Sequence, residues 1–414
     1  MIEELFLEAL KAALKNERVF WDMDIQPDAW RKLFQIADKH QVLPMIYEAV
    51  YDCPSAQRID PRFFEPYKRR MMQSVMMQTV KTSEFLNLYR FLSEKDLKPL
   101  VIKGIICREL YPNPDYRMSS DEDLLIMPGQ FEEFHKAMME YGMRLSDSEM
   151  NIWDVYEVPY GKPGRPIYIE LHKYLFPPDS SAYGDLNRFF EDVFERAESV
   201  PIQNCDILTM NATDHLFYLI CHAFKHFLHS GFGIRQICDI ILFANTHGDA
   251  IDWKMIFGRC QMIHADLFTA AVFKIGQKYL VFDPGQACYP DEWKDIAVDE
   301  SDMLYDLLDG GIFGDSDMSR KHSSTITLNA VTDDKKGKRS RISILRSVFP
   351  SAKSLEGRYS YLKKRAYLLP IAWVDRIVHY GTELKKNTKD SAADAVRIGG
   401  QRVELMKKYG IIKQ

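Results

Sequence analysis

The feature that most constrains this chain is the segment from Asp121 to Ile126, in which two aspartates one residue apart lead into an apolar run. Alternate side chains of an extended strand point to the same face, so Asp121 and Asp123 are expected to lie close together. Neighbouring carboxylates repel each other unless a cation lies between them. Because Mg²⁺ prefers oxygen ligands, usually one or two carboxylates completed by water and phosphates, the pair predicts a magnesium site.

A Lys-Gly turn precedes the aspartates, and the loop between them adds groups that can bind phosphate. Gly104 would let the backbone approach a phosphate and would open a helix whose N-terminus favours anions. Lys103 and Arg117 could neutralise phosphate oxygens, and Ser119 and Ser120 could donate hydrogen bonds to them. An Asp-x-Asp pair alone often only caps a strand or a loop. Its combination with a Lys-Gly turn indicates phosphoryl or nucleotidyl chemistry.

A third carboxylate follows on a later strand. Residues 167–172 alternate apolar and polar side chains, which places Glu170 and His172 on one strand face. Glu170 on an adjacent strand would complete a two-metal cluster with the aspartates, or would take the proton from an attacking hydroxyl. His172 is a candidate substrate-binding residue beside it. The simpler alternative is an exposed strand face with charged side chains, which is common in proteins.

A histidine-rich helix is expected from about residue 211 to residue 230. His222 and His226 are four residues apart, a spacing that resembles a zinc ligand pair and raises the hypothesis of a metal hydrolase. No glutamate follows His222, as the HExxH motif requires, so contact with a substrate phosphate or an interdomain hydrogen bond is favoured. On the next helix, Arg235 and Asp239 are expected to pair with each other or with this histidine face.

Length and composition indicate a globular protein of more than one domain. The chain has 414 residues, with 46% hydrophobic and 27% charged residues. Its seven cysteines are scattered without a CxxC pair, which argues against a disulfide framework or a zinc knuckle. No apolar run is long enough to cross a bilayer, and the N-terminal sequence does not resemble a signal peptide. A cytoplasmic location is therefore expected.

The net charge of −5 conceals a basic C-terminal region. Residues 335–413 contain 20 lysines and arginines against 6 acidic residues, a net charge of +14, so the remainder carries −19. Such a region can dock on the acidic body or attract a polyanion such as RNA. Solvated helix faces explain most charge runs of this kind.

The periodicity predicts an α+β fold, in which a small mostly antiparallel or mixed sheet is embedded in mainly helical N- and C-terminal regions. Strands are expected near residues 99–102, 121–126, 143–146, 151–158 and 166–173, with mainly helix after residue 185. The predicted regions are 1–97 (helical), 98–208 (α+β), 209–310 (helical), 311–341 (a linker or flexible loop) and 342–414 (basic and helical).

These motifs together resemble a known family. The resemblance is carried by Val101–Gly104, Tyr111-Pro112, Arg117, Asp121–Ile126 and Ile169–His172, and in the helical region by His222, His226, Arg235, Asp239 and Ile251–Trp253, with Phe349-Pro350 and Leu368–Pro370 further on. The sequence is similar to the uncharacterised bacterial nucleotidyltransferases of the DNA-polymerase-β-like nucleotidyltransferase superfamily. The similarity covers most of residues 28–375 and is most specific at 101–126.

The resemblance implies a catalytic palm with Asp121 and Asp123 as ligands of one or two Mg²⁺ ions, and Glu170 as the third acidic residue. It implies in-line attack of a hydroxyl on the α-phosphate of a nucleoside triphosphate such as ATP, with release of pyrophosphate. Lys103 or Arg117 would hold the phosphates. Two departures stand out: the usual Gly-Ser before the aspartates is Lys103-Gly104 here, and the third acid is glutamate.

The sequence does not identify the acceptor, which can be a small molecule, a protein or an RNA. An alternative hypothesis is a non-catalytic nucleotide- or RNA-binding protein on the same scaffold, with the basic C-terminal region as its contact surface. The histidine-based metal hydrolase is a third and weaker hypothesis.

Overall fold

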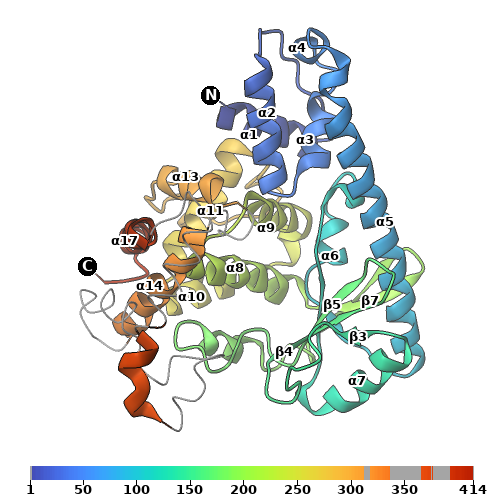
Figure 1. The fold of residues 1–414 in the computed structure, drawn as a ribbon, viewed down its shortest axis with the longest axis vertical. Coiled ribbons are helices and arrows are strands. Elements are labelled where there is room, and N and C mark those ends of the chain that lie inside the picture. Colours follow the sequence, from blue (N-terminus) through green and yellow to red (C-terminus); the bar gives the residue numbers. More distant parts are fainter. Residues whose placement is uncertain (1, 312–317, 336–364, 374, 376–391, 414) are drawn as a thin grey trace.

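The computed structural model describes residues 2–311, 318–335, 365–373, 375 and 392–413. The N-terminal helices are α1 (Ile2–Leu14), α2 (Pro27–Lys39), α3 (Leu43–Val50) and α4 (Pro54–Gln57). The 30-residue helix α5 (Glu65–Glu94) runs from these helices along one side of the molecule to the sheet (Figure 1). It thereby links the N-terminal helices to the part of the chain that carries the aspartates.

The central sheet has five strands in the order β1-β2-β5-β4-β3. Their bounds are β1 (Leu100–Val101), β2 (Glu122–Leu125), β3 (Arg144–Leu145), β4 (Glu157–Gly161) and β5 (Tyr168–His172). Strands β2 and β5 run parallel, whereas the other neighbouring pairs are antiparallel. The predicted α+β fold with a mixed sheet is therefore confirmed, although the strand expected at 151–158 begins only at Glu157.

The two faces of the sheet pack against different elements. One face, which includes Leu124, packs with α5 and with α7 (Phe131–Glu140). The other face, which includes Leu125, belongs to a larger core shared by the N-terminal helices and the helices after residue 211. Consecutive leucines thus enter different cores, as the alternation of a strand requires. The second face is the one on which Asp123 lies, between the sheet and the helices.

A separate hairpin follows the sheet, where the sequence predicted mainly helix. Strands β6 (Glu198–Ile202) and β7 (Cys205–Thr209) pair antiparallel across a turn at Gln203 and Asn204. Gln203 adopts a positive φ of 51°, a conformation that a two-residue hairpin turn requires. Buried side chains alternate along β7, and this short-range pattern is the signal that the prediction overlooked.

Helices dominate the chain beyond the hairpin. They are α8 (Ala212–His229), α9 (Ile234–His247), α10 (Trp253–Met262), α11 (Asp266–Tyr279), α12 (Asp291–Lys294) and α13 (Ser301–Gly310). Asn211 caps α8, because its side-chain oxygen accepts a hydrogen bond of 3.0 Å from the Asp214 amide. None of the helices in the described residues is long and apolar enough to cross a membrane. The boundaries of the predicted regions stay predictions.

Within the linker predicted at 311–341, residues 318–335 form a helix, whereas 312–317 and 336–341 lie outside the described residues. Helix α14 (Met318–Lys335) lies there and packs against α8 and against α17 (Ala392–Lys408). The segment has few large apolar residues, but small ones allow close helix packing: a Cβ on Gly399 of α17 would lie 2.8 Å from Ile326 Cδ1. Helix α17 lies near the end of the predicted basic helical region, of which 342–364 and 376–391 lie outside the described residues.

His215 connects α8 to the end of strand β1 by a hydrogen bond, and its burial is expected to make the fold sensitive to acid. Its Nε2 donates to the Ile102 carbonyl at 2.9 Å, and burial lowers its pKa from 6.5 to about 4. The unfolded chain therefore binds a proton that the folded chain excludes, and about 3 kcal/mol of stability is expected to be lost as the pH falls from about 6.5 to about 4.

Urea unfolding of wild type and of His215→Gln, which keeps a donor, measures this effect. Between about pH 6.5 and about pH 4, the free energy of unfolding of His215→Gln is expected to fall by about 3 kcal/mol less than that of wild type. Parallel pH profiles for the two proteins would contradict the assignment of this buried neutral histidine.

Candidate active site

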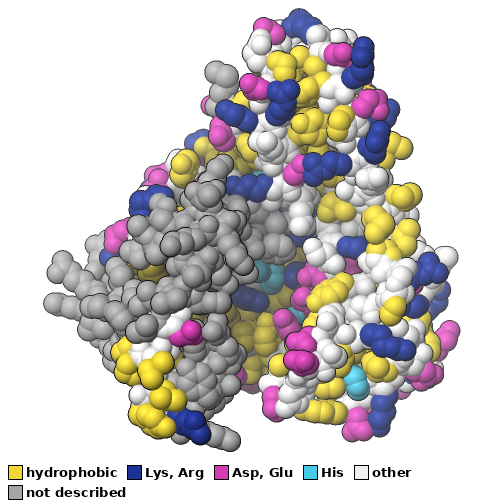
Figure 2. All heavy atoms as spheres, viewed as in Figure 1, with side chains coloured by type: hydrophobic (Ala, Val, Ile, Leu, Met, Phe, Trp, Pro, Cys, Tyr) yellow, Lys and Arg dark blue, Asp and Glu magenta, His cyan; other side chains and the backbone are white. Residues whose placement is uncertain are grey.

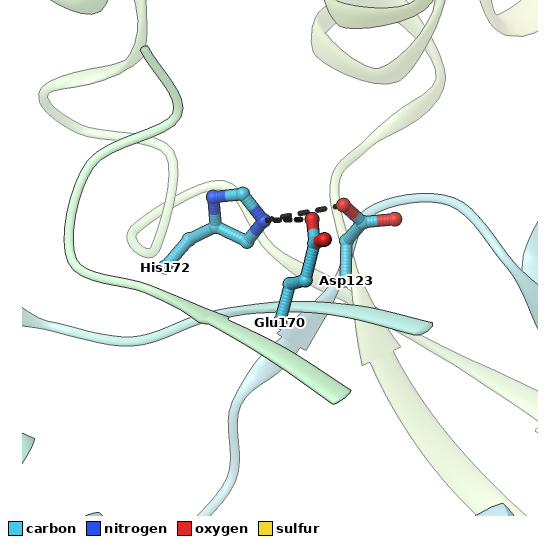
Figure 3. Close-up of side chains that lie close together, drawn as sticks. All are labelled: Asp123, Glu170 and His172. Atoms are coloured by element: carbon cyan, nitrogen blue, oxygen red, sulfur yellow. Dashed lines mark hydrogen bonds and ion pairs between the residues drawn. The ribbon is translucent and has the colours of Figure 1, made fainter. Parts of the chain in front are cut away.

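Strands β2 and β5 place the predicted acidic residues together. In their parallel pairing Asp123 lies opposite Glu170, and Leu125 lies opposite His172. Asp123, Glu170 and His172 therefore project from one face of the sheet. His172 Nε2 lies 3.2 Å from Asp123 Oδ1 and 3.7 Å from Glu170 Oε2 (Figure 3). One potential ligand atom from each of the three lies within 4.8 Å of the other two.

Asp121 lies just before β2 and lines the same cavity as this cluster. Burial and the neighbouring Asp123 raise the pKa of Asp121. The predicted set of Asp121, Asp123 and Glu170 is thus brought to one cavity. The compact group of potential ligands, however, contains His172 in place of Asp121.

Two cationic groups balance the charge of Asp123. Lys103 Nζ lies 3.1 Å from Asp123 Oδ2. Burial opposes the charges of Asp123 and Lys103, but their mutual attraction outweighs it, so the pKa of Asp123 lies well below its usual range and that of Lys103 is raised. Burial also opposes the charge on His172, yet its hydrogen bond to Asp123 and the nearby Glu170 carboxylate raise its pKa to about 9.

The residues of this cluster fit a divalent cation. Asp123 Oδ2 is buried and accepts no hydrogen bond from the described residues; only the Lys103 ammonium faces it. Carboxylate oxygens suit Mg²⁺ or Mn²⁺, whereas the His172 imidazole would bind a transition metal only after losing its proton. A divalent cation bound where the carboxylates converge would take over the neutralisation of Asp123 that Lys103 and His172 now provide.

The helix N-terminus at Gly104, which was predicted to bind a phosphate, is already occupied by a side chain of the protein. Gly104 adopts a positive φ of 53° and opens α6 (Ile105–Arg108), a helix of only four residues. The Ile105 amide donates to Glu122 Oε2 at 2.8 Å, and Arg108 pairs with Glu122 Oε1 at 2.5 Å. Glu122 points to the opposite face of β2 from Asp123. The anion at this helix N-terminus is therefore the protein's own carboxylate.

Replacing Gly104 by alanine is expected to destabilise the fold by at least about 2 kcal/mol. The conformation disfavours an L side chain, and the added Cβ would lie 1.8 Å from Glu122 Oε2. Thermal or urea unfolding measures the loss, with Gly129→Ala as the matched control because no atom lies within 4 Å of a Cβ there. Equal stability of the two variants would contradict the close approach of Glu122.

Arg117 and Ser119 line the cavity, but the fold uses most of their polar groups, although Arg117 Nη1 has no hydrogen-bond partner among the described residues. Arg117 is buried and donates to both carboxylate oxygens of Asp239, at 2.7 Å and 2.6 Å. Ser119 Oγ accepts from Arg108 at 2.8 Å, and its amide donates to Gln78. Ser120 is exposed and is not among the residues that line the cavity. Their predicted contact with phosphate therefore has little support.

His222 and His226 face the cavity from α8. Their Nε2 atoms are 3.3 Å apart, and His222 Nε2 also lies 3.1 Å from Lys103 Nζ. Burial, with nearby lysines, lowers the pKa of both histidines well below the usual value, so both are neutral. Among the described residues, neither belongs to a group of three potential metal ligands. The described residues therefore give the zinc-hydrolase hypothesis no metal site.

The expected pairing of Arg235 with Asp239 is wrong. Asp239 binds Arg117, whereas Arg235 donates to the Met118 carbonyl and, at 2.8 Å, to Gln41 Oε1. Sequence reasoning also missed Lys225, although its place on α8 between the two histidines is a usable signal. Both Lys225 and Arg235 line the cavity.

The cavity has a volume of about 300 Å³ and lies between the sheet and helices α8 and α9. Figure 2 shows a hollow near the centre of one face, where acidic, basic and histidine side chains gather. Carboxylates come mainly from the sheet, and the helices contribute cations and histidines. The cavity can therefore hold a ligand that carries both a bound cation and several negative charges.

A comparison with known proteins identifies the family of the chain. The sequence model described as "Uncharacterised nucleotidyltransferase" matches residues 26–280, more than half of the chain. The match includes α2, the whole sheet and helices α8 to α11, and hence every residue that lines the cavity. No curated protein and no solved structure matches the chain. The chain belongs to this family of uncharacterised nucleotidyltransferases.

Proposed function

We propose that this protein transfers a nucleoside monophosphate from a nucleoside triphosphate to a hydroxyl group of an acceptor, in a reaction that depends on Mg²⁺. The observation that carries the proposal is the pairing of Asp123 with Glu170 on parallel strands, at the edge of a cavity that also contains Asp121. Family membership supports the nucleoside triphosphate as substrate. Placement in the polymerase-β-like superfamily is part of the proposal and rests on the resemblance.

Asp121, Asp123 and Glu170 are the proposed catalytic and metal-binding carboxylates, with His172 as a fourth group of the same site. A bound divalent cation supplies charge neutralisation at the reacting phosphate. His172 donates toward Asp123 and Glu170 and orients both carboxylates. Glu170, which is less buried than Asp123, can accept the proton of the attacking hydroxyl. The Lys103 ammonium, which contacts Asp123, also lies 3.1 Å from Nε2 of the neutral His222.

Nucleotides labelled in the α- or the γ-phosphate test this proposal. Wild type is incubated with Mg²⁺, each nucleoside triphosphate, and panels of small-molecule, protein and RNA acceptors. We expect α-label on an acceptor together with release of pyrophosphate, and loss of both when EDTA removes the metal. Transfer of the γ-label would instead indicate a kinase. Tight binding without turnover across the panels would indicate the non-catalytic nucleotide- or RNA-binding alternative.

A further inference from the structure

The charged groups of the cavity do not all pair with one another. Lys103 is matched by Asp123, and Arg117 is matched by Asp239. Three carboxylates of the cavity have no lysine or arginine partner within salt-bridge distance among the described residues: Asp121, Glu157 and Glu170. His172 lies 3.6 Å from Glu157 and 3.7 Å from Glu170 and supplies one positive charge to this pair. Two cations remain on the side of the helices, Lys225 and Arg235. The cavity thus has an acidic wall on the sheet and a basic wall on α8 and α9.

Lys225 is the first of the unmatched cations. It lies between His222 and His226 on α8 and is only partly exposed. No hydrogen bond or ion pair joins its ammonium group to any described residue. Burial lowers the pKa of Lys225, and nearby Glu157 only partly opposes this effect. A partly buried ammonium group that lines a cavity without an anionic partner is costly unless a ligand supplies one.

Arg235 is the second unmatched cation. Its side chain is 8% exposed, and its Nε has no hydrogen-bond partner among the described residues. Its described hydrogen bonds go to neutral acceptors, the Met118 carbonyl and the Gln41 amide oxygen. Burial and the neighbouring Arg117 lower the pKa of Arg235 to about 10. The pKa of Arg117, in contrast, is raised by its partner Asp239 although Arg117 is also buried.

We propose that Lys225 and Arg235 form a subsite for the polyphosphate of the nucleotide, on the helical wall opposite the carboxylates. The inference deepens the proposed function and rests on it for the identity of the ligand. A triphosphate complexed with a divalent cation matches both walls, because its metal meets the carboxylates and its anionic oxygens meet the cations. The N-terminus of α6 cannot serve instead, because Glu122 occupies it.

Binding of inorganic tripolyphosphate, ATP and adenosine to the full chain tests the subsite by calorimetry with Mg²⁺ present. We expect Lys225→Met to weaken tripolyphosphate and ATP binding by about 10- to 100-fold, with adenosine binding unchanged. Lys225→Arg should restore most of the affinity. Lys98→Met, at an exposed lysine outside the cavity, is the matched control and should bind like wild type. Arg235→Lys, which can still donate to Met118, should show a smaller loss.

The outcomes separate this inference from the proposed function. Wild-type-like binding of tripolyphosphate and ATP by Lys225→Met and Arg235→Lys would overturn the subsite, even if nucleotidyl transfer is found. Weakened polyphosphate binding by these variants would support the subsite, even if the wild type transfers nothing. Failure of the wild type to bind either tripolyphosphate or ATP would overturn both.

Discussion

Replacing Asp123 by asparagine is expected to lower kcat/KM for nucleotidyl transfer by about 10³-fold or more. Asp123 is the most buried carboxylate of the site and contacts both Lys103 and His172. Asparagine keeps the shape but removes the charge that would hold a cation beside the reacting phosphate. The rate of pyrophosphate release under saturating Mg²⁺ measures the effect.

The control for this loss is Asp206→Asn, at an exposed aspartate of strand β7 away from the cavity. It removes the same charge from the chain and is expected to leave the rate unchanged. Unfolding curves of both variants distinguish loss of catalysis from loss of fold. Retention of more than about a tenth of wild-type activity by a folded Asp123→Asn protein would rule out Asp123 as a metal ligand.

Replacing Asp239 by asparagine is expected to destabilise the fold by about 3–5 kcal/mol. Asp239 on α9 is buried, accepts two hydrogen bonds from Arg117, and accepts a third from the Tyr111 hydroxyl at 2.8 Å. The asparagine can still accept from Tyr111, but it leaves the Arg117 charge buried without a counter-ion. Because Arg117 lies in the loop before β2 and Asp239 lies on α9, the variant would also lose the ion pair that connects this loop to the helices.

The free energy of unfolding in urea measures this effect, and a double variant isolates its cause. Arg117→Met with Asp239→Asn removes the stranded charge as well, so it is expected to be more stable than Asp239→Asn alone. A double variant no more stable than the single one would show that the cost is lost hydrogen bonding and not an unpaired charge.

Short-range patterns in the sequence predicted the core of the site. The two-residue period around Asp123 and around Glu170 placed each on a strand face that carries polar groups. The parallel pairing of β2 and β5 then brings these faces into register. The mixed sheet within helical surroundings followed from the same periodicities.

The roles of the cations could not be predicted, because they depend on contacts between distant segments. Arg117 meets Asp239 across 122 positions of sequence, and Lys103 meets His222 across 119. No short-range pattern in the sequence predicts that Asp239 will pair with Arg117, or that Lys225 will have no anionic partner among the described residues. Glu122 is a second example. It lies between Asp121 and Asp123 in the sequence, but its side chain is buried and accepts a hydrogen bond from the first amide of α6.

Helix α14 was missed for a different physical reason. Its residues Ser323, Ser324, Thr327 and Ala330 are small and were interpreted as a linker, yet all are buried. They allow close packing against α8 and α17, and Thr327 donates to the His229 carbonyl at 2.9 Å. Tertiary packing here outweighs a composition that is poor in large apolar residues.

Titration of Mn²⁺ in the presence of a non-hydrolysable nucleoside triphosphate analogue tests the central claim most directly. The electron paramagnetic resonance signal of free Mn²⁺ reports binding to wild type, Asp123→Asn and Asp206→Asn. We predict nucleotide-dependent Mn²⁺ binding by wild type and Asp206→Asn, and an affinity at least about 10-fold weaker for Asp123→Asn. Equal Mn²⁺ affinity of all three proteins would contradict a metal-dependent nucleotidyl-transfer site at Asp123 and Glu170.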